Sequence, residues 1–518
     1  MKKNEPIEKR VFKNTILGVV SFFLTFLQAL ISVPVLLHFW GKETYGLWLS
    51  LFAGFTLLQT LDLGHQNYVG NKLNILYHID KNEFKKTLGS SLVIAYLIGS
   101  VQFLIGLYII FSGLIGSFLG ADISTSTFGQ LEIAFIALIL MWLIFGSASG
   151  IIVKILIPAG MMYESQWLGI LMRLSQSVSL ILVAILGGRI LMAGIMVAIV
   201  QSVVTVFVLF FLKRKLPEFY PWWQVREWRT AFNNFRYSLV ITANSVTQQL
   251  GNNGVILFIA KFFQASMVPV FTTLRTITNT ATNATNIFIY ALIPDVVKFH
   301  ARGEKEKLLI SFDANWFVSS MVVNIGIVLL IPFVREIYLL WTNGQLGFNF
   351  PLFLCLAAGI SFFNFGSGLF TYLTSINDLT AQTFITISRV VIIFAVSYLL
   401  IENSGILGIG IGVVSSEIIA SVLLPIFFVN LRLKRMKTAL NSRNMLMALV
   451  PPIVILIDTL ILSSYSYYSL VISLLSLIIL IPHYYLNWRF LDIEIKRRIK
   501  LIIGKVFPFN ILWGVKNK

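Results

Sequence analysis

The segment VPVLLHFWGKETYGLWLSLFAGFTLLQTLDLGHQNYVGNKL, residues 33–73, joins two apolar runs through a short polar turn, GKETYG, at 41–46. The first run continues back to about residue 14, and the second ends in the polar cluster DLGHQN at 62–67. Each run is long enough to cross the roughly 30 Å hydrocarbon core of a bilayer as a helix. The segment therefore predicts two consecutive membrane helices, with polar groups gathered at the end of the second.

The same apolar pattern recurs along the whole chain. Of its 518 residues, 57% are hydrophobic and 12% are charged, whereas soluble globular proteins carry roughly 25% charged residues. Because apolar stretches of about 18 or more residues predict membrane-spanning helices, we expect an all-α polytopic membrane protein with about 14 transmembrane helices. The predicted spans are 14–37, 46–63, 88–117, 131–152, 166–187, 190–212, 236–260, 268–294, 312–333, 350–374, 382–402, 405–429, 445–463 and 468–487.

The net charge of +18 is distributed unevenly between the two sides of the predicted membrane. With the N-terminus in the cytoplasm, the cytoplasmic segments hold 33 of the 40 Lys and Arg residues, counting Arg236 at the inner boundary of its span, and the outer segments hold four. Such an excess over short loops marks the cytoplasmic side. We therefore expect a multi-pass protein with both termini cytoplasmic, and we assign its basic charge to membrane topology rather than to nucleic-acid binding.

The two halves of the chain share a weak internal repeat. A constant offset of 216 residues places Arg173 on Arg389 and Gln201 on Glu417. Six spans per half give both halves the same direction in the membrane, and parallel repeats of this kind leave the substrate site of several transporters between the halves. The predicted organisation is an N-terminal six-helix bundle at 1–215, an interfacial linker at 216–235, a C-terminal six-helix bundle at 236–435, and two additional helices with a basic cytoplasmic tail at 436–518.

The predicted linker, which contains PEFYPWWQVREWRTAFNNF, mixes aromatic and basic residues. Tryptophan favours the membrane–water interface, and basic residues favour its cytoplasmic side. We predict that this amphipathic stretch lies in the inner interface. The residues concerned are Trp222, Trp223, Trp228, Arg226 and Arg229.

Polar residues recur at helical spacing in spans 1, 2, 7 and 8. Residues three or four apart share one face of a helix, and polar side chains in hydrocarbon are expected to face the protein interior or water. Two interpretations stay open: a hydrated cavity, or hydrogen bonds that hold helices together. Stripes in equivalent spans of both halves favour the cavity. Its candidate lining residues are Asn14, Thr25, Gln28, Gln59, Asp62, Asn244, Gln248, Asn252, Arg275, Asn279, Asn283 and Asn286.

Arg275 is the most informative of these candidates. It lies about seven residues from the outer end of its span, roughly 10 Å deep at a rise of about 1.5 Å per residue. An arginine at depth is costly unless it is hydrated or paired, and its planar guanidinium suits phosphate and carboxylate groups. The first carboxylate of the same span is Asp295, near the inner end. An anionic substrate is therefore favoured over an internal ion pair, which remains the alternative.

Two acidic residues, Glu417 and Asp62, are the candidates for ion coupling. Glu417 lies mid-span with no basic residue nearby in its own helix. It either pairs with Arg389 of the preceding span or binds a coupling proton or sodium ion, and we favour the ion pair. Asp458, in span 13, is expected to make a local hydrogen bond.

The sequence carries no signature of catalysis. Its five histidines show no metal-ligand spacing, and no Walker A sequence occurs. The largest predicted outer loop, about 334–350, is too short for a separate catalytic domain. We therefore expect a protein that is not an enzyme and that uses no cofactor and no metal. A polysaccharide polymerase or ligase is the enzymatic alternative.

Residues 33–73 resemble the N-terminal signature of Wzx-type polysaccharide flippases for O-antigen or capsule, in the multidrug/oligosaccharidyl-lipid/polysaccharide exporter (MOP) superfamily. The matching parts are Pro34, the turn from Gly41 to Tyr45 and Gly46, and the sequence DLG that begins at Asp62. Two six-span halves plus an extra pair extend the resemblance over nearly the whole chain. The resemblance implies two bundles packed as a V, with spans 1, 2, 7 and 8 lining a central cavity.

The same resemblance implies a function. Such flippases move an undecaprenyl-pyrophosphate-linked oligosaccharide from the cytoplasmic to the outer leaflet of the bacterial inner or plasma membrane by alternating access, for surface polysaccharide biosynthesis. Arg275 would face the pyrophosphate or acidic sugars, and the Asn and Gln residues would meet sugar hydroxyls. The implied partners are the lipid-linked oligosaccharide, membrane lipid, an H⁺ or Na⁺ coupling ion, and polysaccharide polymerase and chain-length proteins. A multidrug/cation antiporter on the same fold is the alternative, although span 1 lacks an acidic residue.

Overall fold

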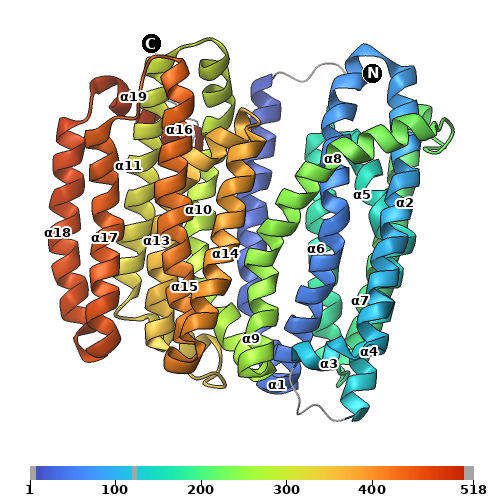
Figure 1. The fold of residues 1–518 in the computed structure, drawn as a ribbon, viewed down its shortest axis with the longest axis horizontal. Helices are drawn as coiled ribbons and strands as arrows, with labels where there is room; N and C mark the ends of the chain where they lie inside the picture. Colours follow the sequence, from blue (N-terminus) through green and yellow to red (C-terminus); the bar gives the residue numbers. More distant parts are fainter. Residues whose placement is uncertain (1–6, 120–124, 507–518) are drawn as a thin grey trace. The chain divides into compact units, whose positions relative to one another are not determined.

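The computed structural model describes residues 7–119 and 125–506, and every regular element in those ranges is helical (Figure 1). Eleven of the described helical stretches are long and apolar enough to cross a membrane. The predicted all-α polytopic architecture is therefore confirmed. The end of the predicted basic tail, 507–518, lies outside the described residues.

The fourteen predicted spans coincide with helical stretches, although 88–117, 166–187, 312–333 and 405–429 include a few residues of adjoining turns. The first two lie in α1, Ile7–Ile79, on either side of Gly41, whose φ of 68° and ψ of 174° interrupt the helix. Glycine adopts a positive φ without steric penalty. The predicted turn at 41–46 is therefore a break at one residue, after which the helix resumes.

The other helices follow one another through short connections. π-Helical turns occupy Trp142–Gly146, Leu250–Gly254 and Ile418–Leu423. The α-helices after α1 are α2 (Lys81–Phe111), α3 (Leu114–Leu119), α4 (Thr125–Met141), α5 (Ser147–Val153), α6 (Met162–Ile185), α7 (Ile190–Lys215), α8 (Trp228–Gln249), α9 (Val255–Phe263), α10 (Val268–Ala301), α11 (Lys305–Leu330), α12 (Val334–Trp341), α13 (Phe350–Ser375), α14 (Leu379–Ser404), α15 (Leu407–Glu417), α16 (Leu424–Arg435), α17 (Ser442–Ser464), α18 (Ser469–Phe490) and α19 (Ile493–Val506).

Contacts divide the chain into two compact units. Unit 1 comprises Met1–Pro269 and Trp341–Leu346, and unit 2 comprises Val270–Leu340 and Gly347–Lys518. The repeat assigns most of α8 to the second bundle, whereas α8 packs along α1 within unit 1. The bundle boundaries inferred from the repeat stay a prediction, because contacts report packing rather than sequence symmetry.

Glycines permit the close packing of α1 against its neighbours in unit 1. A Cβ atom on Gly64 would lie 2.3 Å from the backbone of Thr242 in α8, and one on Gly46 would lie 1.8 Å from the carbonyl oxygen of Ala265. Any larger residue at either position would push two backbones apart. The α1–α8 packing thus depends on residues far apart in the sequence.

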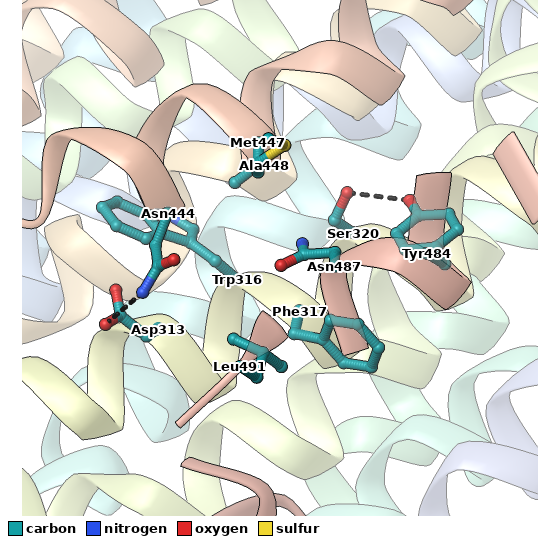
Figure 2. Close-up of a pocket in the computed structure, with 10 residues that line it drawn as sticks. All are labelled: Asp313, Trp316, Phe317, Ser320, Asn444, Met447, Ala448, Tyr484, Asn487 and Leu491. Carbon is teal, nitrogen blue, oxygen red and sulfur yellow. Dashed lines mark hydrogen bonds between the residues drawn. The ribbon is translucent and has the colours of Figure 1, made fainter. Parts of the chain in front are cut away.

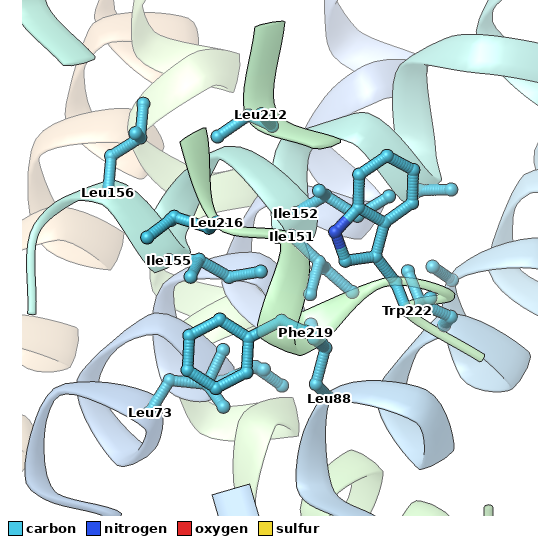
Figure 3. Packing of buried hydrophobic residues seen from close by; sticks show 14 of the residues in the cluster. Leu73, Leu88, Ile151, Ile152, Ile155, Leu156, Leu212, Leu216, Phe219 and Trp222 are labelled. Atoms are coloured by element: carbon cyan, nitrogen blue, oxygen red, sulfur yellow. The ribbon is translucent and has the colours of Figure 1, made fainter. Parts of the chain in front are cut away.

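A hydrophobic cluster anchors the linker after α7 to unit 1 (Figure 3). Leu73 of α1, Leu88 of α2 and Ile151 of α5 are buried in it, and Phe219 and Trp222 of the linker fill the same cluster. Burying apolar surface stabilises the fold by roughly 25 cal/mol per Å². The first part of the linker is therefore part of the core of unit 1.

In unit 2, α13 is the central helix. It packs against α11, α15 and α17, and large residues such as Phe353 and Tyr372 are fully buried along it. A helix that is apolar on all faces is typical of such a central position. The additional helix pair joins this core through α17, and Asp458 of α17 accepts 2.8 Å hydrogen bonds from Ser476 of α18 at both carboxylate oxygens. The local hydrogen bond expected for Asp458 is confirmed.

Candidate functional site

Asp62 is fully enclosed in unit 1. Its exposed fraction is 0%, and its Oδ2 accepts a 2.6 Å hydrogen bond from Gln66 Nε2. Its Oδ1 lacks a hydrogen bond of normal geometry, because the nearby hydroxyl of Ser147 donates instead to the Ala95 carbonyl at 2.7 Å. A buried carboxylate with one unsatisfied oxygen is costly, which makes this position a candidate for binding a proton or cation.

The neighbouring residues of the DLGHQN cluster form a polar seam between α1, α2 and α8. His65 is fully buried, with Nδ1 3.2 Å from Ser238 Oγ and Nε2 3.4 Å from the Ser91 carbonyl oxygen. About two helical turns after His65, Lys72 Nζ donates a 3.0 Å hydrogen bond to Asn234 Oδ1. The cluster that ends span 2 therefore joins three helices, and its buried members are shielded from solvent in this conformation.

The remaining candidates of unit 1 have varied environments. Gln28 of α1 is half-buried and donates a hydrogen bond to Ser177 of α6, whereas Thr25 is exposed and bonds to the Ser21 carbonyl within its own helix at 2.8 Å. Asn244 of α8 is 7% exposed, and neither of its amide atoms has a hydrogen-bond partner among the described residues. Gln59 is half-buried, Gln248 and Asn252 are exposed, and the side chain of Asn14 lies outside the described residues.

Arg275 lies on α10 in unit 2 and is half-buried. Its guanidinium carbon is 5.9 Å from the centroid of the Phe271 ring, and its charge interacts with that of Glu417. Further along α10, Asn279 is half-buried and Asn283 is exposed, whereas the side chain of Asn286 lies outside the described residues. Glu417 lies outside α10, so at least part of the negative charge that acts on Arg275 comes from another helix.

Glu417 forms the ion pair that we expected. Its Oε1 lies 3.0 Å from Arg389 Nε, and its Oε2 accepts a 2.5 Å hydrogen bond from Ser421. Ser421 in turn accepts a 2.8 Å hydrogen bond from Arg389 Nη2, which closes a three-residue ring. Glu417 also interacts electrostatically with Arg275, so its carboxylate interacts with two guanidinium groups. The two arginines and Glu417 therefore interact electrostatically in this part of unit 2.

A π-helical turn follows Glu417 directly. It spans Ile418–Leu423 and contains Ser421, whose carbonyl oxygen would lie 1.9 Å from a Cβ atom on Gly366. A second such turn, Leu250–Gly254, contains the candidate Asn252. π-Helical turns are rare and frequently occur at functional sites, so their coincidence with two polar candidates supports a role for these segments. Sequence reasoning did not find them, because hydropathy carries no signal of helix winding.

The structure also reveals a small pocket with polar and apolar walls between α11, α17 and α18 (Figure 2). Asn444 Nδ2 donates a 2.8 Å hydrogen bond to Asp313 Oδ2, and the hydroxyls of Ser320 and Tyr484 lie 3.0 Å apart. The only sequence signal for it was the spacing of polar residues on one face of α11. The lining residues are Asp313, Trp316, Phe317, Ser320, Asn444, Met447, Ala448, Tyr484, Asn487 and Leu491.

Two further ion pairs tie helices together in unit 2. Asp378, which caps α14, is 2.5 Å from Arg432 of α16, and Asp295 of α10 is 2.6 Å from Arg498 of α19. Within the described ranges, no group of three or more His, Cys, Asp and Glu residues could hold a metal ion. Like the pair of Arg389 with Glu417, these two pairs join residues of different helices.

Comparison with known proteins identifies the fold. No protein-family model and no curated protein matches the sequence. Among solved structures, the lipid II flippase MurJ in an inward closed conformation matches with a TM-score of 0.64 and 11% identity, over 92% of this chain and 99% of that chain. An inward-facing MATE multidrug transporter of the MOP superfamily matches with a TM-score of 0.61 and 16% identity, over 82% and 99% of the two chains.

A third match is a MOP superfamily transporter from Pyrococcus furiosus, described as having a binding pocket of reverse polarity. Its TM-score is 0.60 at 16% identity, over 83% of this chain and 97% of that chain. Likenesses at such low identity establish the fold and leave the substrate open. The chain thus has the helical architecture shared by MurJ and MATE transporters.

Proposed function

We propose that this protein is a flippase that moves an undecaprenyl-pyrophosphate-linked oligosaccharide from the cytoplasmic to the outer leaflet of the bacterial cell membrane. It would work by alternating access, with both termini in the cytoplasm, and serve O-antigen, capsule or related polysaccharide biosynthesis. The fold it shares with a lipid flippase supports transport of a lipid-linked substrate. The observation that carries the proposal is that two interior arginines, Arg275 and Arg389, both interact with Glu417.

The charge balance of that cluster favours an anionic substrate. Guanidinium groups inside a membrane protein are costly unless they are paired or bind a ligand, and their planar donors suit phosphate oxygens. Arg389 is held by Glu417 and Ser421. We assign Arg275, on α10, to the pyrophosphate or to acidic sugars. Asn279 and Asn283, further along α10, would donate to sugar hydroxyls.

The acids Asp62 and Glu417 would serve different roles. Glu417 is engaged by Arg389, so we assign it to holding the arginines in place. Asp62 is enclosed and incompletely hydrogen-bonded, so it is the better candidate for a coupling H⁺ or Na⁺. We assign the remaining polar residues of α1 and α8, including Asn244, to a polar lining within unit 1.

A multidrug/cation antiporter is the second candidate. The MATE transporters that share the fold support it, as does the enclosed carboxylate of Asp62. The arginine cluster around Glu417 argues against a cationic substrate, because like charges repel in a low-dielectric interior. A polysaccharide polymerase or ligase is third, because the structural relatives are transporters.

The test is a leaflet assay in cells that lack the protein. Undecaprenyl-pyrophosphate-linked oligosaccharide should accumulate on the inner leaflet, and wild-type protein should relieve the accumulation. In parallel, resistance to cationic dyes is measured in the same strains. Unchanged lipid-linked oligosaccharide together with increased dye sensitivity would replace the flippase with the antiporter.

A further inference from the structure

The segment between α7 and α8 is held rigidly on unit 1 at several points. Phe219 and Trp222 are 2% and 7% exposed within the hydrophobic cluster of Figure 3. The backbone N–H of Glu227 donates a 2.9 Å hydrogen bond to Ser90 Oγ of α2. A Cβ atom on Gly89 would lie 2.1 Å from the Val225 carbonyl oxygen, so the linker backbone rests directly on α2.

Because the linker is fixed, its other aromatic residues are held away from the core. Trp223 is 51% exposed, Trp228 is 70% exposed and Phe232, in the first turns of α8, is 63% exposed. The rings of Tyr220 and Trp223 are 6.0 Å apart, and Lys213 Nζ lies 4.3 Å from the centroid of the Tyr220 ring. Large exposed aromatic side chains on an anchored backbone indicate a surface that binds a lipid bilayer or another molecule.

The same segment is strongly basic. Between residues 213 and 236 there are six Lys and Arg residues and two Glu residues. Glu227 is 3.3 Å from Lys86 of α2, and a hydrogen bond from Thr230 together with the Lys86 ammonium holds the pKa of the Glu227 carboxyl below its usual range. This acid is therefore occupied within the protein. The basic residues are Lys213, Arg214, Lys215, Arg226, Arg229 and Arg236, all exposed.

We propose that this basic–aromatic surface, formed by Trp223, Trp228, Arg226 and Arg229, is a binding site for the phosphate headgroups of anionic phospholipids. Tryptophan rings are stable at the headgroup level of a bilayer, where the indole is apolar and its N–H can still donate. Arginine beside them attracts the negative leaflet and donates to phosphate oxygens. Because the backbone of the linker is anchored to α2, the entropy cost of ordering this surface on binding is lowered. The proposal does not depend on the transported substrate.

An ordinary cytoplasmic charge excess would attract anionic lipid as well, so the test needs a matched control. Lys434 and Arg435, at the end of α16 in unit 2, are exposed and adjacent in sequence, but unlike Arg226 and Arg229 they have no tryptophan within ten residues of them in the sequence. The proposal predicts selectivity for Arg226 and Arg229 over this pair. Equal losses from both pairs would instead indicate bulk electrostatics.

The experiment uses the full-length protein in nanodiscs of phosphatidylcholine alone or with a quarter of phosphatidylglycerol. Phosphatidylglycerol should raise the Tm of the wild type by several degrees, and native mass spectrometry should detect retained phosphatidylglycerol. The double variant R226Q/R229Q should lose most of that shift and bind phosphatidylglycerol several-fold more weakly, whereas K434Q/R435Q should keep both. No effect of phosphatidylglycerol on the wild type, or the same loss in both variants, overturns the proposal.

A second readout tests the aromatic residues without removing a charge. Brominated phosphatidylglycerol should quench tryptophan fluorescence more strongly than brominated phosphatidylcholine, and W223F/W228F should lose that difference. These substitutions leave Trp222, the buried anchor, in place. Equal quenching by the two lipids would place the rings against lipid in general and would overturn headgroup selectivity.

Discussion

Arg389 Nε lies 3.0 Å from Glu417 Oε1, with the two side chains only 17% and 10% exposed. Removing one partner from a largely buried pair leaves an uncompensated charge. The ring is completed by Ser421, which donates to the glutamate and accepts from the arginine. Glu417 therefore holds α14 and the start of the following π-helical turn together.

Glu417→Gln should destabilise the protein by about 3 kcal/mol, because Arg389 would lose its counter-charge. Thermal or denaturant unfolding in detergent measures the change. Glu304→Gln serves as the control, since the side chains of Lys307 and Glu304 are 63% and 26% exposed, more than those of Arg389 and Glu417, and the loss of their pair should change little. If Glu417→Gln unfolds like the wild type but alters the ion dependence of transport, the acid is a coupling site and our assignment is wrong.

Gly64→Ala should destabilise unit 1 by about 1–3 kcal/mol. The added methyl would lie 2.3 Å from the Thr242 backbone and force α1 away from α8. Gly54→Ala in the same helix is the matched control, because nothing lies within 4 Å of its Cβ position. That change should be neutral or stabilise by up to about 1 kcal/mol. Equal effects of the two substitutions would refute the close α1–α8 contact.

Trp222→Ala should cost about 3–5 kcal/mol, because a large ring would leave a cavity in the cluster of unit 1. Its neighbour Trp223 is 51% exposed, so Trp223→Ala should change the unfolding free energy in detergent by less than about 0.5 kcal/mol. The measurement is the free energy of unfolding of the two variants, taken from their unfolding curves. If the linker does not pack into the core of unit 1, both substitutions should change the unfolding free energy by the same small amount.

Tyr484→Phe tests the pocket between α11, α17 and α18. The substitution removes the contact between the Tyr484 and Ser320 hydroxyls, which are 3.0 Å apart, and should cost about 1 kcal/mol. Tyr467, 91% exposed in the short turn that joins α17 to α18, is the control, and Tyr467→Phe should have no measurable effect. A neutral result at Tyr484 would mean that the additional helices do not rely on this hydrogen bond.

The sequence predicts the helices of this protein well, because apolar length alone decides whether a segment crosses a membrane. The break at Gly41 and the ion pair of Arg389 with Glu417 also follow from local pattern and from the adjacency of consecutive spans. These features depend on residues near one another in the chain or in successive helices.

Other features depend on contacts that no local pattern encodes. The enclosure of Asp62 depends on packing of α1 against α5, and the position of α8 in unit 1 depends on Gly64 fitting against Thr242. The electrostatic interaction of Arg275 with Glu417 connects α10 with a helix more than a hundred residues further along the chain. Polar spacing identified these residues as candidates, but only the fold determines which of them meet.

The most direct test of the central claim is lipid flipping by purified protein in liposomes. A fluorescent undecaprenyl-pyrophosphate oligosaccharide is incorporated, and its arrival in the opposite leaflet is followed by chemical quenching. The account predicts rapid flipping by the wild type and by Arg335→Ala, an exposed control arginine, and at least about a tenfold loss in Arg275→Ala, equivalent to about 1.4 kcal/mol in the barrier. Flipping by Arg275→Ala at the wild-type rate would contradict the role of this residue, and no flipping by the folded wild type would contradict the proposed function.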